Sequence, residues 1–177
     1  MEVLCGAQPG PRGGDGAAML DDKELADLVL ESVRLVDEGE LNPPAASASA
    51  PAFRPQAMLA MLTYCYAIGV YGSEDVELMM REDASLRALC GTEIPDWKRL
   101  KRFRRQNHAL LQRTLEETFR SAWSLSCRAH QTASAPLDGR PVETGSRLPD
   151  PAVADWVAAE AAARIERAMF LDLMATE

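Results

Sequence analysis

Six basic side chains stand close together in the middle of this sequence of 177 residues. They are Lys98, Arg99, Lys101, Arg102, Arg104 and Arg105. On a helix, positions 98, 101, 102 and 105 follow one another at three- and four-residue spacing and share one face. Cationic side chains in such a row can neutralise successive phosphates of a nucleic acid. The cluster therefore predicts a phosphate-binding helix face, and the alternative is a solvated face that balances the acidic remainder.

The charge of the rest of the chain opposes phosphate binding. Segment 96–105 carries +5, whereas the whole chain carries -8, which leaves -13 for the remainder. Binding responds to the field at one face and not to the total charge, so both interpretations stay open. If four or five of the basic side chains contact phosphates, log affinity should fall against log salt with a slope of about -4.

No other group of residues has the spacing of a reactive site. The four cysteines stand singly and the only histidines are His108 and His130, which disfavours zinc. The adjacent carboxylates Glu116 and Glu117 would point in different directions on a helix and so make a poor acid–base pair. We therefore expect no catalytic residue, no metal site, no cofactor and no small-molecule substrate, and we expect that the protein is not an enzyme.

The longest uncharged stretch, 55–73, has nearly the length of a membrane span. Polar residues and Gly69 dilute it, so a buried core helix is the favoured interpretation. Segment 1–18 has glycine, proline and acid where a secretory signal needs basic and then apolar residues. We expect a cytoplasmic protein with reduced thiols that does not bind a membrane.

The elements that must position the basic cluster are all predicted to be helices. Apolar periodicity predicts helices over 22–38, 55–68, 73–82, 83–90, 96–128 and 150–177. The predicted N-caps are Asp21 or Asp22, Ser73, Asp83, Asp96 and Asp150, the last followed by Pro151. The predicted C-terminal stops are Gly39, Gly69 and Gly91.

Two of these helices are predicted to build the core, and the last helix is predicted to carry an apolar stripe that is buried either on the domain or on a second chain. Helix 55–68 is apolar nearly all round and should lie at the centre. Helix 96–128 has the core stripe Leu100, Phe103, Leu110, Leu111, Leu115, Phe119 and Ala122. The last helix has the stripe Val153, Trp156, Val157, Ala161, Ile165, Met169 and Leu173. Trp97 is expected to pack on the preceding turn, with a base or sugar contact as the alternative.

The predicted organisation has four parts. Residues 1–20 are Gly/Pro-rich and predicted to be disordered, and 21–129 form a small helical domain. Segment 130–149 is a flexible linker and 150–177 is a C-terminal helix. The fold class is all-α, with amphipathic helices at both ends. The centre of the helical domain has a helix-turn-helix-like layout, which consists of helix 83–90, a turn and the basic helix.

An ordered set of short motifs runs through this domain. It consists of Phe53-Arg54-Pro55 with Leu59, Leu62-Thr63-Tyr64-Cys65-Tyr66-Ala67-Ile68-Gly69, Ser73, Glu77, Arg81-Glu82-Asp83, Leu86-Arg87-Ala88-Leu89-Cys90-Gly91, Pro95-Asp96 and Phe103-Arg104-Arg105. With this set, residues 53 to about 115 resemble the N-terminal domain of InsH-type insertion-sequence (DDE) transposases. The resemblance implies a helix-turn-helix DNA-binding domain that recognises duplex DNA at transposon ends, with the six basic residues as its contacts.

The resemblance does not extend to catalysis. Members of that family continue into an RNase H-like fold with three catalytic carboxylates that hold two metal ions. Asp138-Gly139 is similar to the first catalytic motif, but no apolar strand precedes it and only 39 residues follow Asp138. The first hypothesis is therefore a truncated or co-opted transposase N-terminal domain that binds DNA without catalysis.

Two alternatives remain open. The protein is either a helical module for protein interaction or self-association, or a transposase relic without function. In the interaction module the terminal helices would bury their apolar stripes on a second chain and form a homo-oligomer. Light scattering separates this alternative from a monomeric DNA-binding domain.

Overall fold

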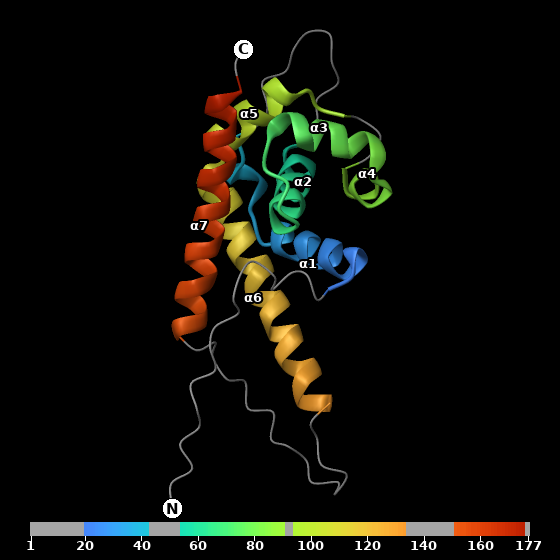
Figure 1. Ribbon diagram of the computed structural model, residues 1–177, viewed down its shortest axis with the longest axis vertical. Coiled ribbons are helices and arrows are strands. Elements are labelled where there is room, and N and C mark those ends of the chain that lie inside the picture. The colour runs from blue at the N-terminus through green and yellow to red at the C-terminus, as the bar shows by residue number, and fades with distance from the viewer. Residues whose placement is uncertain (1–19, 43–53, 91–93, 134–150, 176–177) are drawn as a thin grey trace, which may run out of the picture.

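The computed structural model describes residues 20–42, 54–90, 94–133 and 151–175, which fold as helices without a strand (Figure 1). The elements are α1 (Asp22–Arg34), a 3-10 helix η1 (Glu38–Glu40), α2 (Pro55–Ala67), α3 (Ser73–Glu82), α4 (Ala84–Cys90), α5 (Trp97–Gln106), α6 (His108–Ala133) and α7 (Pro151–Met174). The all-α prediction is confirmed. Predictions for the N-terminal arm, the Gly91 stop, Asp138-Gly139 and Asp150 lie outside the described residues.

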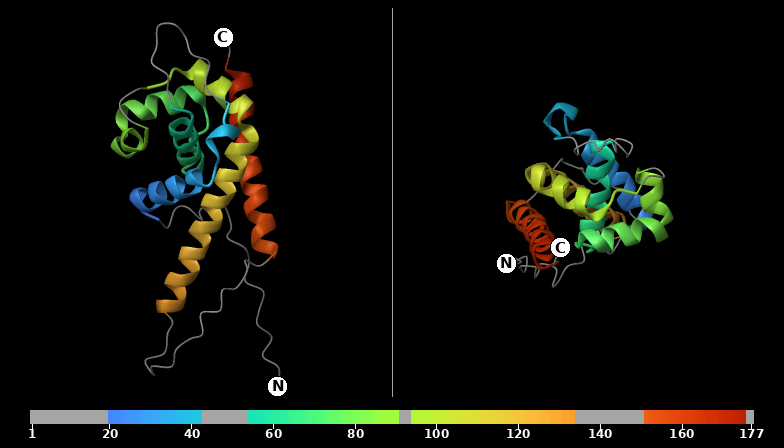
Figure 2. Two further views of the ribbon diagram at one scale, coloured as in Figure 1. Left: turned by 180° about the vertical axis from the view of Figure 1, so that it is seen from behind. Right: turned by 90° about the horizontal axis from the view of Figure 1, so that it is seen from above.

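Helix α2 is the centre of the fold. α1, α4 and α6 pack around it, and the long helices α6 and α7 run antiparallel along one side (Figures 1 and 2). Ten consecutive residues of α2, from Met58 to Ala67, are buried. The helix begins at Pro55, as predicted, and the chain leaves it through Gly69 at φ 91°. The prediction of a central helix that is apolar all round is therefore confirmed.

The left-handed conformation of Gly69 leads to a stability prediction. Gly69→Ala should lower the free energy of unfolding by about 1 to 2 kcal/mol, because an L side chain is strained at positive φ. The new methyl group would lie 3.9 Å from the Tyr71 hydroxyl oxygen, an ordinary van der Waals contact, so a packing clash is excluded as the cause. Gly39→Ala is the matched control, since Gly39 is not left-handed and its Cβ would make an ordinary contact. Urea unfolding should show that the free energies of unfolding of the two variants differ by about 1 to 2 kcal/mol.

The N-terminal helix begins as predicted and ends earlier. Asp21 is the N-cap and forms a capping box with Glu24, whose backbone N–H donates to Asp21 Oδ1 over 2.7 Å. The helix stops at Arg34, so the prediction of a helix to residue 38 with Gly39 as its stop is wrong. The cause is Asp37, which caps η1 and accepts a hydrogen bond from the Gly39 N–H over 3.0 Å. The amphipathic face of α1 is confirmed by its buried side chains Leu25, Val29 and Val33.

Of the N-caps predicted for α3 and α4, the one for α3 is wrong and the one for α4 is confirmed. Ser73 is not the N-cap of α3, because Gly72 has that position and Ser73 is the first helical residue. The Ser73 hydroxyl is used elsewhere: it is buried and donates to Asp172 Oδ1 over 2.8 Å. The prediction for Asp83 is confirmed, since its Oδ1 accepts from the backbone N–H of Leu86 over 3.2 Å.

The predicted helix 96–128 is in fact two helices with a break at Asn107. Asn107 has φ -122° and ψ 22°, outside helical geometry. Its side chain is bound to the backbone of Asn42, accepting from the N–H over 2.9 Å and donating to the carbonyl over 3.1 Å. The core stripe continues across the break, with Leu110 half-buried and its other members buried. Helix α6 extends to Ala133, so residues 130–133 of the predicted linker are helical.

Helix α7 starts at Pro151 as predicted, but toward its C-terminal end the predicted apolar stripe no longer coincides with the buried face. Val157, Ala161 and Ile165 are buried, whereas Met169 and Leu173 are 38% and 73% exposed. These two members of the predicted stripe do not pack on the domain, because other residues take the inward positions. They are Arg164, Ala168 and Asp172.

The predicted helix-turn-helix-like centre is not specifically shown. Helix α3 packs against both α4 and α5, which lie at opposite ends of it (Figure 1). Within the described part of the chain, α4 and α5 are not among the main packed pairs of helices.

Candidate nucleic-acid interface

The basic helix α5 is fixed at its first turn. Asp96 is its N-cap, as predicted, and accepts the backbone N–H of Arg99 over 2.9 Å. The backbone N–H of Trp97 donates to Glu77 Oε2 on α3 over 3.0 Å. These bonds satisfy donors that a helix start leaves open, and they tie α5 to α3.

Three of the six predicted cations form one exposed row on α5. Lys98, Arg102 and Arg105 are exposed at i, i+4 and i+7. The row is about 10 Å long at 1.5 Å per residue. Lys101 and Arg99 are half-buried on its two sides, and Arg99 forms an ion pair with Asp96 over 3.5 Å. We call these five residues the basic face of α5.

Trp97 lies at the start of the basic face. It is half-buried and lines a hollow together with Leu171 of α7. The ammonium groups of Lys98 and Lys101 lie 5.3 and 5.8 Å from the centre of its ring, within range of a cation–π interaction. The packing of Trp97 on the preceding turn stays a prediction, because residues 91–93 of that turn lie outside the described residues.

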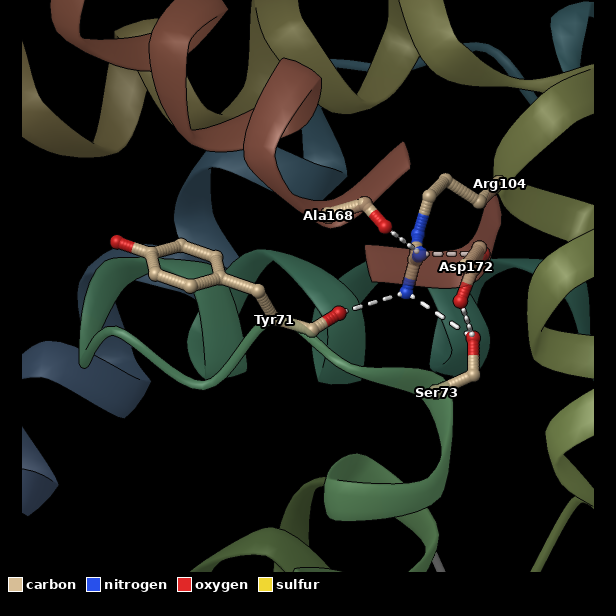
Figure 3. A network of polar contacts seen from close by, with 5 residues as sticks. All are labelled: Tyr71, Ser73, Arg104, Ala168 and Asp172. Carbon is tan, nitrogen blue, oxygen red and sulfur yellow. Dashed lines mark hydrogen bonds and ion pairs between the residues drawn. The ribbon is translucent and has the colours of Figure 1, made fainter. Parts of the chain in front are cut away.

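Arg104 is not part of the exposed row, contrary to its place in the predicted cluster. Its side chain is 0% exposed and forms an ion pair with Asp172 of α7 (Figure 3). It also donates to the backbone carbonyls of Ala168 over 2.8 Å and Tyr71 over 3.0 Å, and to Ser73 Oγ over 3.2 Å. A signal was present in the sequence, because Arg104 follows the core residue Leu100 by four positions and so shares its face.

The Arg104 network joins three helices in the interior. Asp172 accepts from Arg104 with one oxygen and from Ser73 with the other (Figure 3). The Arg104 guanidinium also lies 5.3 Å from the centre of the Tyr66 ring. Burial raises the pKa of Tyr66 above its usual value, and the nearby positive charge of Arg104 acts in the opposite direction. Since Asp172 neutralises Arg104, the effective charge of segment 96–105 falls from +5 to +4.

Within the described ranges, no three His, Cys, Asp or Glu side chains gather as ligands of a metal ion would. No described helix combines the length and the apolarity that crossing a membrane requires.

Comparison with known proteins gives one match. Residues 19–106 match the family model "Transposase domain (DUF772)", which spans α1 to α5 and includes the whole basic face. Neither the curated proteins nor the solved structures give a match. The matched segment begins earlier than the predicted stretch of 53 to about 115 and ends with the last residue of α5. Residues 19–106 of this chain therefore form a transposase-related domain.

Proposed function

We propose that this protein is a DNA-binding module derived from the N-terminal domain of an InsH-type insertion-sequence transposase, without catalytic activity of its own. Its ligand is duplex DNA, such as transposon ends in the cytoplasm. The observation that carries the proposal is the row of Lys98, Arg102 and Arg105 on the surface of a transposase-related domain.

The surroundings of α5 support phosphate binding by this row. The Asp96 cap, the bond to Glu77 and the buried Arg104 network fix the helix on three sides. A face that is ordered before binding loses less conformational entropy when it binds. Arg104 has a positioning role in this proposal, because its buried side chain directs Lys98, Arg102 and Arg105 outward.

Charge reversal on the basic face tests the proposal. Arg102→Glu/Arg105→Glu should weaken binding of a labelled random duplex at low salt by at least about tenfold. It should also reduce the salt slope from about -4 by about 2, since two phosphate contacts are lost. Fluorescence anisotropy at several salt concentrations measures both quantities.

The control is Arg34→Glu/Arg113→Glu, which changes the net charge equally at exposed arginines of α1 and α6. The control should retain most of the wild-type affinity, since these residues lie off α5. Equal affinity of the two double variants, both folded by circular dichroism, would refute the basic face as the binding site. The proposal also fails if the wild-type protein does not bind at low salt.

Self-association is a second candidate function, and one observation favours it. The C-terminal end of α7 exposes large apolar side chains, and Phe170, Leu173 and Met174 are 59%, 73% and 66% exposed. Apolar side chains that gather on one surface often mark an interaction site.

A further inference from the structure

Helix α7 is apolar on two opposite faces. Its inner face packs on the domain through Val157, Ala161, Ile165 and Ala168. Its outer face is exposed and mostly apolar, with Ala152, Ala159 and Ala163 in the first half of the helix and Phe170 and Leu173 in the second. The charged residues on this face are Asp155 and Glu166. A helix that only covered its own domain would carry polar residues on the outer face.

The outer face has the spacing of a helix–helix seam. Trp156, Ala159, Ala163, Glu166, Phe170 and Leu173 follow one another at alternating three- and four-residue steps. This alternation keeps the side chains in line over successive turns and is the pattern of coiled-coil contacts. Trp156 is half-buried beside Trp123 at the edge of this seam, and the other five residues are exposed. We call the six residues the outer seam.

The position of α7 leaves the outer seam accessible to a partner. The helix lies at the edge of the helical body in every view (Figures 1 and 2). Its 24 residues give a length of about 36 Å, enough for several layers of contacts. The last two turns contain one charged residue, Asp172, and that side chain points inward to Arg104.

Side-chain size along the outer seam favours an antiparallel partner of the same sequence. If two α7 helices cross antiparallel near residues 164 and 165, Ala159 of one copy lies opposite Phe170 of the second copy. Trp156 then lies opposite Leu173, and Ala163 opposite Glu166. Phe170 and Glu166 thus each meet an alanine, and only Trp156 and Leu173 are two large side chains that face each other. A parallel pair would instead place Glu166 against Glu166 and Phe170 against Phe170.

Charged residues at the border of the outer seam also favour an antiparallel pair of α7 helices. Glu160 and Arg167 both flank the outer seam on one side, seven residues apart. An antiparallel pair brings Glu160 of one copy near Arg167 of the second copy, twice by symmetry. In the protomer, Glu160 accepts from Arg164 Nε over 2.7 Å and Arg167 lies over the Tyr71 ring, so both side chains are held near this border.

We infer that α7 is a self-association surface and that two copies of this chain pair antiparallel through the outer seam. The pairing buries the apolar end of each α7 on the alanine-rich half of the other. The basic face of α5 stays uncovered, because α5 meets α7 with its Arg104 side and carries Lys98, Arg102 and Arg105 on the other side. Dimerisation therefore does not depend on DNA binding.

Sedimentation equilibrium of the full chain tests the dimer. The wild-type protein should be a dimer, and Phe170→Glu should raise the dissociation constant at least about tenfold, because both apolar contacts between Phe170 and Ala159 are lost and the seam gains a carboxylate beside Glu166 in each copy. Leu78→Glu is the matched control: Leu78 is 55% exposed on α3, away from the outer seam, and its variant should remain a dimer. Leu173→Ser is a second seam variant that should weaken the dimer with less disturbance of the helix.

Mixing two variants tests the orientation. Ala159→Lys and Phe170→Glu should each weaken self-association, and their equimolar mixture should restore dimers, because the introduced lysine faces the introduced glutamate only in an antiparallel pair. Thermal unfolding monitored by circular dichroism should show both variants folded, since both positions are exposed. The inference is overturned by a wild-type monomer up to about 100 µM, by seam variants that dimerise like wild type, or by a mixture that stays monomeric.

Discussion

Asp172→Asn is expected to lower the free energy of unfolding by about 3 to 5 kcal/mol, although it changes one carboxylate to an amide. The reason is the complete burial of its partner Arg104, which is 0% exposed. Removing one member of a buried ion pair leaves the other charge in the interior without its counterion. The amide retains an acceptor for Ser73, so the loss reports mainly on the unpaired guanidinium. Urea unfolding monitored by circular dichroism measures it.

An exposed ion pair provides the control for Asp172. Glu31→Gln removes the partner of Arg34, and both side chains of that pair are 70% exposed. Its expected cost is less than about 1 kcal/mol, because water replaces the lost partner. If Asp172→Asn costs no more than this control, the pair with Arg104 does not stabilise the attachment of α7. The double replacement Arg104→Met/Asp172→Leu should recover much of the loss, since neither charge remains in the core.

The parts of the fold that the sequence predicted correctly depend on local interactions. Asp21, Asp83 and Asp96 cap helices with backbone N–H groups three residues away. Gly69 stops α2 because it alone takes the left-handed conformation within the described ranges. A local pattern is sufficient to find such positions.

The parts that were predicted wrongly depend on partners far along the chain. The break at Asn107 is stabilised by bonds to Asn42, 65 residues away. Ser73 binds Asp172, 99 residues away, instead of capping its own helix. The spacing of residues in one segment contains no information about such partners.

The candidate site likewise combines a feature that follows from local spacing with one that depends on a distant partner. The row of Lys98, Arg102 and Arg105 follows from helical spacing, and the structure places all three on the surface. The sequence places Arg104 in the basic cluster because it is one of six basic residues close together. Its position in the core depends on Asp172, which is 68 residues away along the chain. Two local signals existed: Arg104 shares a face with Leu100, and Asp172 is the only charge in an apolar helix end. DNA binding by the remaining five residues stays a prediction.

Arg164→Met is expected to cost about 2 to 4 kcal/mol of unfolding free energy, because Arg164 attaches α7 to the C-terminal end of α2. Its Nη1 donates to the carbonyls of Tyr66 and Ala67 over 2.7 and 2.8 Å. The last carbonyls of a helix lack the partner that carbonyls in the helix interior have, and these two residues are buried. The Tyr66 carbonyl also accepts from the backbone N–H of Gly69 over 3.2 Å. Methionine retains the apolar stem of the side chain but provides no donor, so the carbonyls lose their bonds with the arginine.

The matched control for Arg164 is Arg120→Met on α6, because Arg120 pairs with Glu117 at a partly exposed site. Its expected cost is below about 1 kcal/mol. Amide hydrogen exchange distinguishes the two variants. Arg164→Met should increase the exchange rate in α7 and in the last turn of α2 more than in the rest of the core, because the bonds that connect these two segments are lost. Equal exchange in both variants would mean that Arg164 does not contribute to holding α7 on the domain. An increase confined to α7 and α2 would instead make Arg164 a second polar link, beside the Arg104–Asp172 pair, between the transposase-related domain and the helix outside the family match.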